Sequence, residues 1–556
     1  MSGTEKTCVL DASSEARQTE HHSLPKDGSK SDAASAEERR IDAALITGQT
    51  GSKAQGAAAG HTFTESDLHL EPQEYRRLLR KIDLAIVPYV TLLYLLSFLD
   101  RVNIGQAATL GLRTDLGLVG NQYAVALTVF FVSYVAVELP SMIWFKKIGV
   151  RYCIPAIMVA WAIVMTLMGV VHNAAGLQAA RFFLGLCEGP LFPLLNYMLS
   201  CWYTRKQQGT RVAIFFSGAT LSGAFGGILA YGLSRIPMPA GPFQGENWHW
   251  IFIIEGILTL VCALPGYWLL VDFPAVEKRL LSPLESAQWN HVLAKSQGVT
   301  NAEVPFSWLQ VKSGVGEWRT WVHAIMYLAI ANPLYSLALF TPQIITGLGS
   351  FPRTSANLLS VPPYVVGFIT TIAMAWFSDK FLVRSIPIIA GMLVTIVGYI
   401  ILICDVSAGV KYFALHLTVA GVSPCIALAI TWTGNTFGPA YKRATSMAIF
   451  FSFGNSAGLI SSNVYPLAEA PRYFKGHGIN LGFSVLAIAC AVVLGLANMR
   501  ENKQRDKISY ANPDGSSADP LKANDEDEKA RWGLTGMSRE DIVLLGDKHP
   551  AFRYAL

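Results

Sequence analysis

Residues 213–217 read Ala-Ile-Phe-Phe-Ser, and residues 448–452 read the same five letters again. Arg211 precedes the first copy and Arg443 precedes the second, so each copy follows a basic residue. Each copy also opens a long apolar run with few charges. One five-residue match in apolar sequence can arise by chance, so a second match at the same spacing is needed to indicate an internal duplication.

A second pair of matching segments keeps the same spacing. Trp-Phe stands at 144–145, directly before Lys146, and again at 376–377, three residues before Lys380. Both pairs are six apolar runs apart and occupy matching places in their runs. The sequence therefore predicts two parallel six-helix halves, an arrangement typical of carriers that rock one half against the other around a central site.

The composition agrees with a membrane protein. The 556 residues are 52% hydrophobic and 15% charged, whereas soluble domains carry about 25% charged residues. Each apolar run is close to the roughly 20 residues that cross the hydrocarbon layer as a helix. We predict an all-α polytopic membrane protein in contact with the lipid bilayer. Its twelve transmembrane helices are expected near 84–110, 122–144, 150–171, 175–201, 211–234, 250–271, 320–346, 355–377, 385–404, 411–432, 444–465 and 480–498.

Polar segments divide the chain into five parts. Residues 1–74 and 499–556 are polar, lack apolar periodicity and are expected to be disordered tails. The six-helix halves are expected at 75–271 and 319–498, joined by a central loop at 272–318. Lys and Arg gather in alternate gaps between the runs, and this bias places both termini and the central loop in the cytosol.

Ionisable residues inside the predicted spans point to function, because one charge at a helix centre costs about 2.5–3.5 kcal/mol on insertion scales. Asp100 and Arg101 fall in the first span, and Arg181 and Glu188 in the fourth. Arg181 and Glu188 are two helical turns apart and share a face. Arg binds carboxylates through paired hydrogen bonds, and a low dielectric favours the protonated carboxylate. We predict that Arg101 and Arg181 hold an anion, and that Glu188 with Asp100 carries a proton.

Two structural ion pairs, Asp100 with Arg101 and Arg181 with Glu188, are the alternative interpretation of these charges. Gly189-Pro190 favours the functional interpretation, because a helix that opens there exposes backbone groups to a ligand.

Weaker candidates for substrate contact lie in the second half. These are Asn435, Asn455 and Tyr335, and the seventh span is expected to break at Asn332-Pro333 just before Tyr335. The acidic residues Glu138 and Glu255 lie near the ends of predicted spans and are interpreted as helix-end or gating contacts.

Several segments together resemble the major facilitator superfamily, specifically its anion:cation symporter branch, which contains the fungal allantoate and nicotinate permeases. The resemblance covers about 75–500. Its most specific segments are LDRVNIG at 99–105, RFFLGLCEG at 181–189, WY at 202–203, ANLLSVPPY at 356–364, GN at 434–435 and KR at 442–443.

The resemblance implies proton-driven uptake of small carboxylates. It assigns coupling and substrate roles to Asp100, Arg101, Arg181 and Glu188, and a substrate contact to Asn435. It also implies a gate at the loops after the second and eighth spans, where this chain offers Lys147, Arg151, Asp379 and Arg384. The first loop lacks the acidic residue that the family usually carries, while the second keeps Asp379.

We therefore predict a monomeric plasma-membrane symporter that imports a small organic anion, such as a vitamin or a nitrogen-source acid, by alternating access. The vacuolar membrane is the alternative location. An exporter of a fungal secondary metabolite and a nutrient sensor with little transport are the alternative functions. The sequence holds no catalytic, metal-binding or phosphate-loop motif and no basic stripe, so no enzyme activity, metal, cofactor or nucleic-acid partner is expected.

Overall fold

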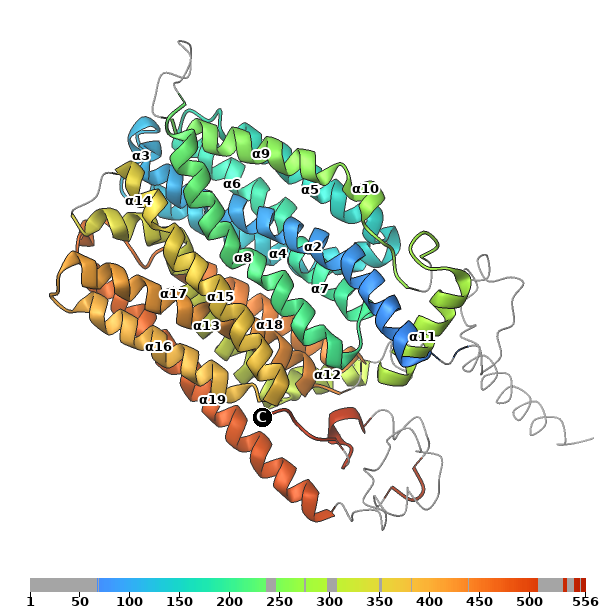
Figure 1. The fold of residues 1–556 in the computed structure, drawn as a ribbon. Coiled ribbons are helices and arrows are strands. Elements are labelled where there is room, and N and C mark those ends of the chain that lie inside the picture. The colour runs from blue at the N-terminus through green and yellow to red at the C-terminus, as the bar shows by residue number, and fades with distance from the viewer. Residues whose placement is uncertain are drawn as a thin grey trace, which may run out of the picture. The chain divides into compact units, whose positions relative to one another are not determined.

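The computed structural model describes residues 68, 70–236, 247–274, 277–297, 308–349, 353–381, 383–438, 440–508, 534–537, 545–550 and 552–556. Within these ranges the regular structure is helical, and no strand occurs. Figure 1 shows long helices with roughly parallel axes, those of the first half in blue to green and those of the second half in yellow to orange.

The helices follow the predicted order. The first half contains α2 (Pro72–Thr109), α3 (Leu112–Asp115), α4 (Gln122–Ile148), α5 (Val150–Met168), α6 (Ala174–Glu188), α7 (Leu191–Trp202), α8 (Arg205–Leu233), α9 (His249–Ala263) and α10 (Gly266–Leu269). The central segment forms α11 (Pro283–Gln297) and α12 (Trp308–Gly316). The second half contains α13 (Trp318–Gly347), α14 (Arg353–Leu359), α15 (Val361–Phe381), α16 (Ser385–Ile403), α17 (Ala408–Thr436), α18 (Ala440–Ser461) and α19 (Phe474–Ile508).

The packing repeats between the halves in the way that the sequence repeat predicts. In the first half α2 packs along α8, and in the second half α13 packs along α18. The halves meet where α8 lies against α15, α4 against α18 and α2 against α13. The two copies of the repeated segment therefore lie on corresponding helices, α8 and α18.

Ten helical stretches in the described ranges are long and apolar enough to cross a membrane. The predicted second and eleventh spans correspond to α4 and α18, which are not among these ten, although 122–138 of α4 forms a shorter apolar helix. α18 is poorer in apolar residues, since it carries polar residues such as Ser446, Asn455 and Ser461. These three side chains are buried in the protein. The helical membrane fold is confirmed, and the count of twelve spans stays a prediction.

The sequence predicts interruptions in two helices, one in the fourth span and one in the seventh. The fourth span is divided at Gly189-Pro190 into α6 and α7, but both residues keep helical dihedral angles and Ala174–Trp202 forms one membrane-length stretch, so the predicted opening of the helix is not seen. The break expected at Asn332-Pro333 is wrong, because α13 continues through both Pro333 and Pro342. Asn332 instead donates a hydrogen bond from Nδ2 to Asn480 Oδ1 at 2.8 Å, which ties α13 to α19 across the proline.

The two ends of the helix bundle are distinguished by their side chains. We call the end that carries Thr210, Asp379 and Lys442 the inner end. The end that carries Thr109, Arg113 and Gln343 is called the outer end. The first residues of α2 and α13 lie at the inner end, since these helices reach Thr109 and Gln343 near their last residues.

The prediction of disorder after residue 498 is wrong for part of that segment. α19 continues to Ile508, and residues 545–550 and 552–556 pack on the inner end of the second half. Asp547 is 1% exposed and accepts from Lys442 Nζ at 2.7 Å and from the backbone N–H of Gly438 at 3.0 Å. The Ala555 carbonyl accepts from Trp432 Nε1 at 3.0 Å.

Aromatic and backbone contacts complete this packing. The Tyr554 ring lies between Arg319 and Arg505, with guanidinium carbons at 4.5 and 4.8 Å from the ring centre. Burial, together with the charge of Arg505, lowers the pKa of His549. Because contacts of this kind join residues far apart in the sequence, apolar periodicity gave no indication of them.

Close approach of the halves at one glycine gives a first test of the fold. A Cβ on Gly105 of α2 would lie 2.2 Å from the Leu339 carbonyl oxygen of α13. Overpacking costs about 1–3 kcal/mol, so Gly105→Val should reduce the population of molecules with closed halves by roughly 5- to 150-fold. For the symporter that the sequence resemblance implies, a matching loss of initial uptake rate is expected at unchanged expression in the membrane.

Gly232→Val in α8 is the matched control, because a Cβ there meets nothing within 4 Å. It should leave uptake unchanged. Uptake by Gly105→Val at the rate of the control would contradict the close approach of α2 and α13.

Candidate functional site

An ion pair between the first and fourth predicted spans forms the centre of the site. Arg101 Nη2 and Nε lie 2.6 and 3.1 Å from Glu188 Oε1, and Ser97 Oγ donates to the same oxygen at 2.7 Å. Arg101 is 2% and Glu188 0% exposed. Glu188 is the last residue of α6, and its carboxylate lies beside α2.

This pairing differs from both ion pairs considered from the sequence. Arg181 is not joined to Glu188, and Asp100 is not joined to Arg101. Neighbouring residues on a helix do not face each other, so α2 turns Arg101 and Asp100 toward different helices. The contact from α2 to α6 depends on how these helices are rotated, which spacing within one helix does not reveal.

Arg181 is a buried cation without a carboxylate partner in the described part of the chain. Its Nη2 makes one long hydrogen bond of 3.4 Å to the Arg101 carbonyl, and its guanidinium carbon lies 4.7 Å from the centre of the Phe130 ring. Nε and Nη1 have no hydrogen-bond partner among the described residues, although the side chain is 0% exposed. A buried charge is costly unless it is paired, so Arg181 is the group best suited to bind an anion.

Asp100 lies on the other side of α2, within the first half. Its Oδ2 accepts from Trp161 Nε1 and from Thr259 Oγ1, both at 2.9 Å. One turn further along, Asn103 Nδ2 donates to Glu255 Oε2 at 2.7 Å. Glu255 is therefore buried in the middle of α9, and its interpretation as a contact near a helix end is wrong.

A chain of hydrogen bonds connects the second half to the first. Tyr335 Oη donates to Asn455 Oδ1 at 2.9 Å, and Asn455 Nδ2 lies 3.1 Å from both carboxylate oxygens of Glu138. Two predicted residues, Tyr335 and Asn455, are thus brought together at the boundary between the halves. Glu138 lies in the middle of α4 and is 3% exposed, so its interpretation as a helix-end contact is also wrong, whereas its contact across the halves is of the kind that the gating interpretation expects.

Arg101 lies among aromatic rings that connect the Arg101–Glu188 ion pair with the hydrogen bonds of Tyr335, Asn455 and Glu138. Its guanidinium carbon is 4.7 Å from the ring centre of Tyr134, 5.4 Å from Phe98 and 5.9 Å from Tyr335. Contacts of this kind stabilise a buried guanidinium. We call Arg101, Glu138, Arg181, Glu188, Tyr335 and Asn455 the central cluster.

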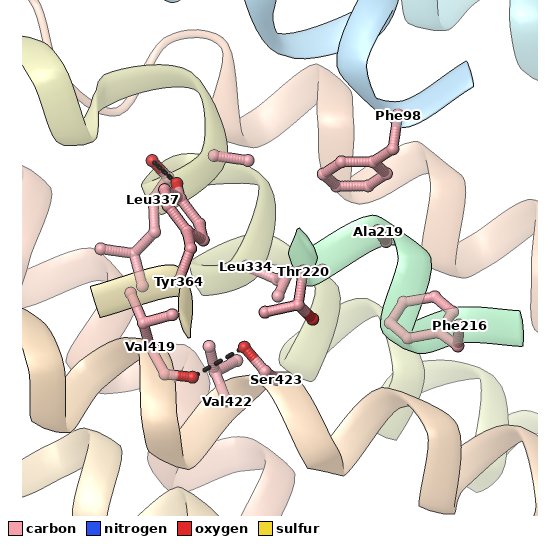
Figure 2. Close-up of a pocket in the computed structure, with 11 residues that line it drawn as sticks. Phe98, Phe216, Ala219, Thr220, Leu334, Leu337, Tyr364, Val419, Val422 and Ser423 are labelled. Carbon is pink, nitrogen blue, oxygen red and sulfur yellow. Dashed lines mark hydrogen bonds between the residues drawn. The ribbon is translucent and has the colours of Figure 1, made fainter. Parts of the chain in front are cut away.

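The halves are closed around the central cluster. Figure 2 shows a pocket beside it, where Phe98 and Thr220 of the first half face Leu334, Tyr364 and Ser423 of the second. The free volume of this pocket is about 10 Å³, which is room for about one water molecule. A molecule larger than water therefore fits in this pocket only after the halves separate.

Hydrogen bonds between the halves occur at both ends of the bundle. At the inner end Thr210 Oγ1 donates to Asp379 Oδ2 at 2.6 Å. At the outer end Arg113 Nη2 donates to Gln343 Oε1 at 2.9 Å, and Thr109 Oγ1 donates to Asn357 Oδ1 at 3.2 Å. Opening either end has to break contacts of this kind.

The family model described as Major Facilitator Superfamily matches residues 90–462, which is more than half of the chain. The chain belongs to the major facilitator superfamily. This superfamily consists of transporters, so the protein is a multi-pass membrane transporter and not an enzyme.

Curated fungal relatives of this superfamily member agree with the assignment. It is 33% identical to the high-affinity nicotinic acid transporter of Saccharomyces cerevisiae, over 78% of this chain and 80% of that one. It is 32% identical to the MFS-type transporter cnsO of Penicillium expansum, over 88% and 93% of the two chains. An uncharacterized transporter of Schizosaccharomyces pombe is 34% identical, over 80% of this chain and 87% of that one.

A solved structure supports the fold of this superfamily member. The bacterial homologue of the human lysosomal transporter Spinster, in an inward-facing and occupied conformation, matches with a TM-score of 0.55. It covers 78% of this chain and 98% of its own at 15% identity, which is evidence for the fold alone.

Of the predicted gate residues, Asp379 and Arg384 lie at the boundary between the halves, and Arg151 does not. Asp379 Oδ1 pairs with Arg384 Nη2 at 2.5 Å, beside Thr210 of the first half. Arg151 Nε donates to the Tyr267 carbonyl at 2.6 Å and stays within the first half. The side chain of Lys147 lies outside the described residues. The first loop, which lacks the usual acidic residue, thus shows no contact between halves through Arg151.

Asn435 is the predicted substrate residue that the structure does not bring to the central cluster. It stands one residue before the end of α17, at the inner end, where Trp432 contacts Ala555. Its substrate role stays a prediction. Glu138 is the residue of the central cluster to which the sequence assigned no substrate or proton role, and its place inside a long apolar run was the available signal.

Proposed function

We propose that this transporter is a proton-coupled symporter that imports a small organic anion with a carboxylate group. The observation that carries the proposal is Arg181, a fully buried guanidinium with no carboxylate partner among the described residues, next to the Arg101–Glu188 pair. An anionic substrate supplies the missing partner of Arg181. The carboxylates of the same cluster supply places for a proton.

The surroundings of the cluster favour a flat substrate. Phe98, Phe130, Tyr134 and Tyr335 present their rings around the two guanidiniums, and such faces stack on aromatic acids. The resemblance to a nicotinic acid transporter over most of both chains makes nicotinic acid the first compound to test. We propose a monomer as the working unit.

The proposed orientation has both chain termini and the central loop in the cytosol, with the protein in the plasma membrane. The inner end is then the cytosolic end. Proton-coupled import in this orientation requires uptake that rises as the external pH falls.

Uptake of radiolabelled nicotinic acid into yeast lacking its own transporter tests the proposal. We expect faster and accumulative uptake at acidic external pH, slower uptake at alkaline pH, and loss of accumulation with a protonophore. Competition by pantothenic acid, allantoate and other carboxylates, compared with their amides, tests whether the anionic group is required.

An exporter built on the same fold is the competing function, because the chain is nearly as similar to the MFS-type transporter cnsO, whose name gives no direction of transport, as to the nicotinic acid transporter. Lower retention of a preloaded acid in cells that express the chain, without net uptake, would favour export. Uptake that ignores external pH and the protonophore would overturn proton symport.

A further inference from the structure

Glu138 is a buried carboxylate at the boundary between the two halves. It lies on α4 of the first half, and its hydrogen-bond partner Asn455 lies on α18 of the second. The other hydrogen bonds between halves described above lie at the inner and outer ends. Separation of the halves therefore exposes Glu138 to water, and closure buries it again.

The groups that face Glu138 offer it little compensation. Tyr134 of its own helix, Tyr327 and Tyr335 of α13 and Arg101 of α2 are the titratable groups in electrostatic range. Arg101 is already paired with Glu188 at 2.6 Å. α18 contributes the neutral amide of Asn455, and Arg181 of α6 donates to α2.

Charge counting in the central cluster then links substrate and proton. Asp100 and Glu255 lie on the other side of α2, with hydrogen-bond partners inside the first half, and are kept out of this count. Arg101 and Glu188 cancel, which leaves Arg181 and Glu138 with opposite charges. A substrate anion that binds Arg181 leaves the Glu138 charge unbalanced. Closing the halves over an unbalanced charge is unfavourable in a low dielectric, and a proton on Glu138 removes it. Closure of the halves is thus favoured when anion and proton are both bound or both absent. A symporter needs this condition, because it must not carry one of the two across the membrane without the other.

We propose that Glu138 is the carboxylate that takes up the coupled proton when the substrate anion occupies Arg181. This inference rests on the proposed function and deepens it, since it assigns proton binding to a residue that lies across the interface from Asn455. Glu188 is held by Arg101 and Ser97, and it sets the charge balance without leaving its partners.

Glu138→Gln and Glu138→Asp together test the inference. Gln keeps the length and the hydrogen bond to Asn455 but cannot release a proton, whereas Asp keeps the acid and withdraws it from Asn455. We expect Glu138→Gln to retain exchange of labelled for unlabelled substrate, to lose accumulation, and to lose the dependence of uptake on external pH. Glu138→Asp should keep pH-dependent accumulation at a reduced rate.

The opposite ranking would overturn the inference, because a structural contact to Asn455 is better preserved by Gln than by Asp. Wild-type coupling retained in Glu138→Gln would overturn it as well. If wild-type uptake itself ignores pH, the proposed function fails, which separates the two failures.

Labelling of the wild-type protein covers the case in which Glu138→Gln does not fold. Dicyclohexylcarbodiimide reacts with protonated carboxyls in apolar surroundings, and peptide mass spectrometry distinguishes Glu138 from Glu188. We expect labelling of Glu138 that falls as pH rises and increases when nicotinic acid is added. Labelling of Glu188 with Glu138 unmodified at every pH would overturn the inference.

Discussion

Glu188→Gln should exchange substrate across the membrane but fail to accumulate it. The neutral amide still offers an oxygen to Ser97 and Arg101, so the fold is kept, but the charge that balances Arg101 is gone. Arg101 then balances Glu138, and the anion can be carried without a proton. Each coupled proton normally supports about tenfold accumulation per pH unit of gradient, and this factor should be lost.

The measurement is the steady-state ratio of inside to outside nicotinic acid, with counterflow exchange as the control for folding. Glu188→Asp keeps the charge and should retain part of the accumulation. Full accumulation by Glu188→Gln would contradict the role of this carboxylate in coupling.

Arg181→Met should abolish saturable uptake of carboxylate substrates. Losing one partner of a buried charge pair costs about 2–5 kcal/mol, which corresponds to a loss of affinity of roughly 30-fold to several thousand-fold. Arg181→Lys keeps the charge but not the planar pair of donors, so an intermediate loss is expected. The affinities can be read from the substrate concentration that gives half-maximal exchange.

The matched control is a neutral analogue. Nicotinamide lacks the carboxylate, so any residual binding of nicotinamide should be the same in the wild type and in Arg181→Met. Unchanged affinity for nicotinic acid in Arg181→Met would show that the anion binds elsewhere, and Arg101 would be the next residue to test.

The sequence was sufficient to predict the helical fold and most helix positions, because apolar run length and an internal repeat are local properties. The charged residues Arg101, Arg181 and Glu188 were also recognisable, since charges are rare inside apolar runs. Their pairing was not predictable, because it depends on the rotation of α2 against α6. One part of the pairing could have been inferred. Asp100 and Arg101 are adjacent on one helix, so their side chains face different neighbouring helices.

Glu138 was misjudged because α4 was expected to end near residue 144, whereas it continues to Ile148. The hydrogen bond from Asn455 to Glu138 joins residues more than 300 positions apart, and no local pattern reports such a contact. The same holds for the C-terminal segment, in which Asp547 meets Lys442.

The packing of the C-terminal segment has a practical consequence for handling the purified protein. Residues 545–550 and 552–556 are held by side chains of α13, α17, α18 and α19, and not only by the peptide chain that leads to them. A protease cut between residues 508 and 545 should therefore leave the segment attached through purification. The transporter would then be a two-chain assembly whose short chain can be exchanged for a synthetic peptide, which offers a route to place a fluorophore at the inner end without changing any helix.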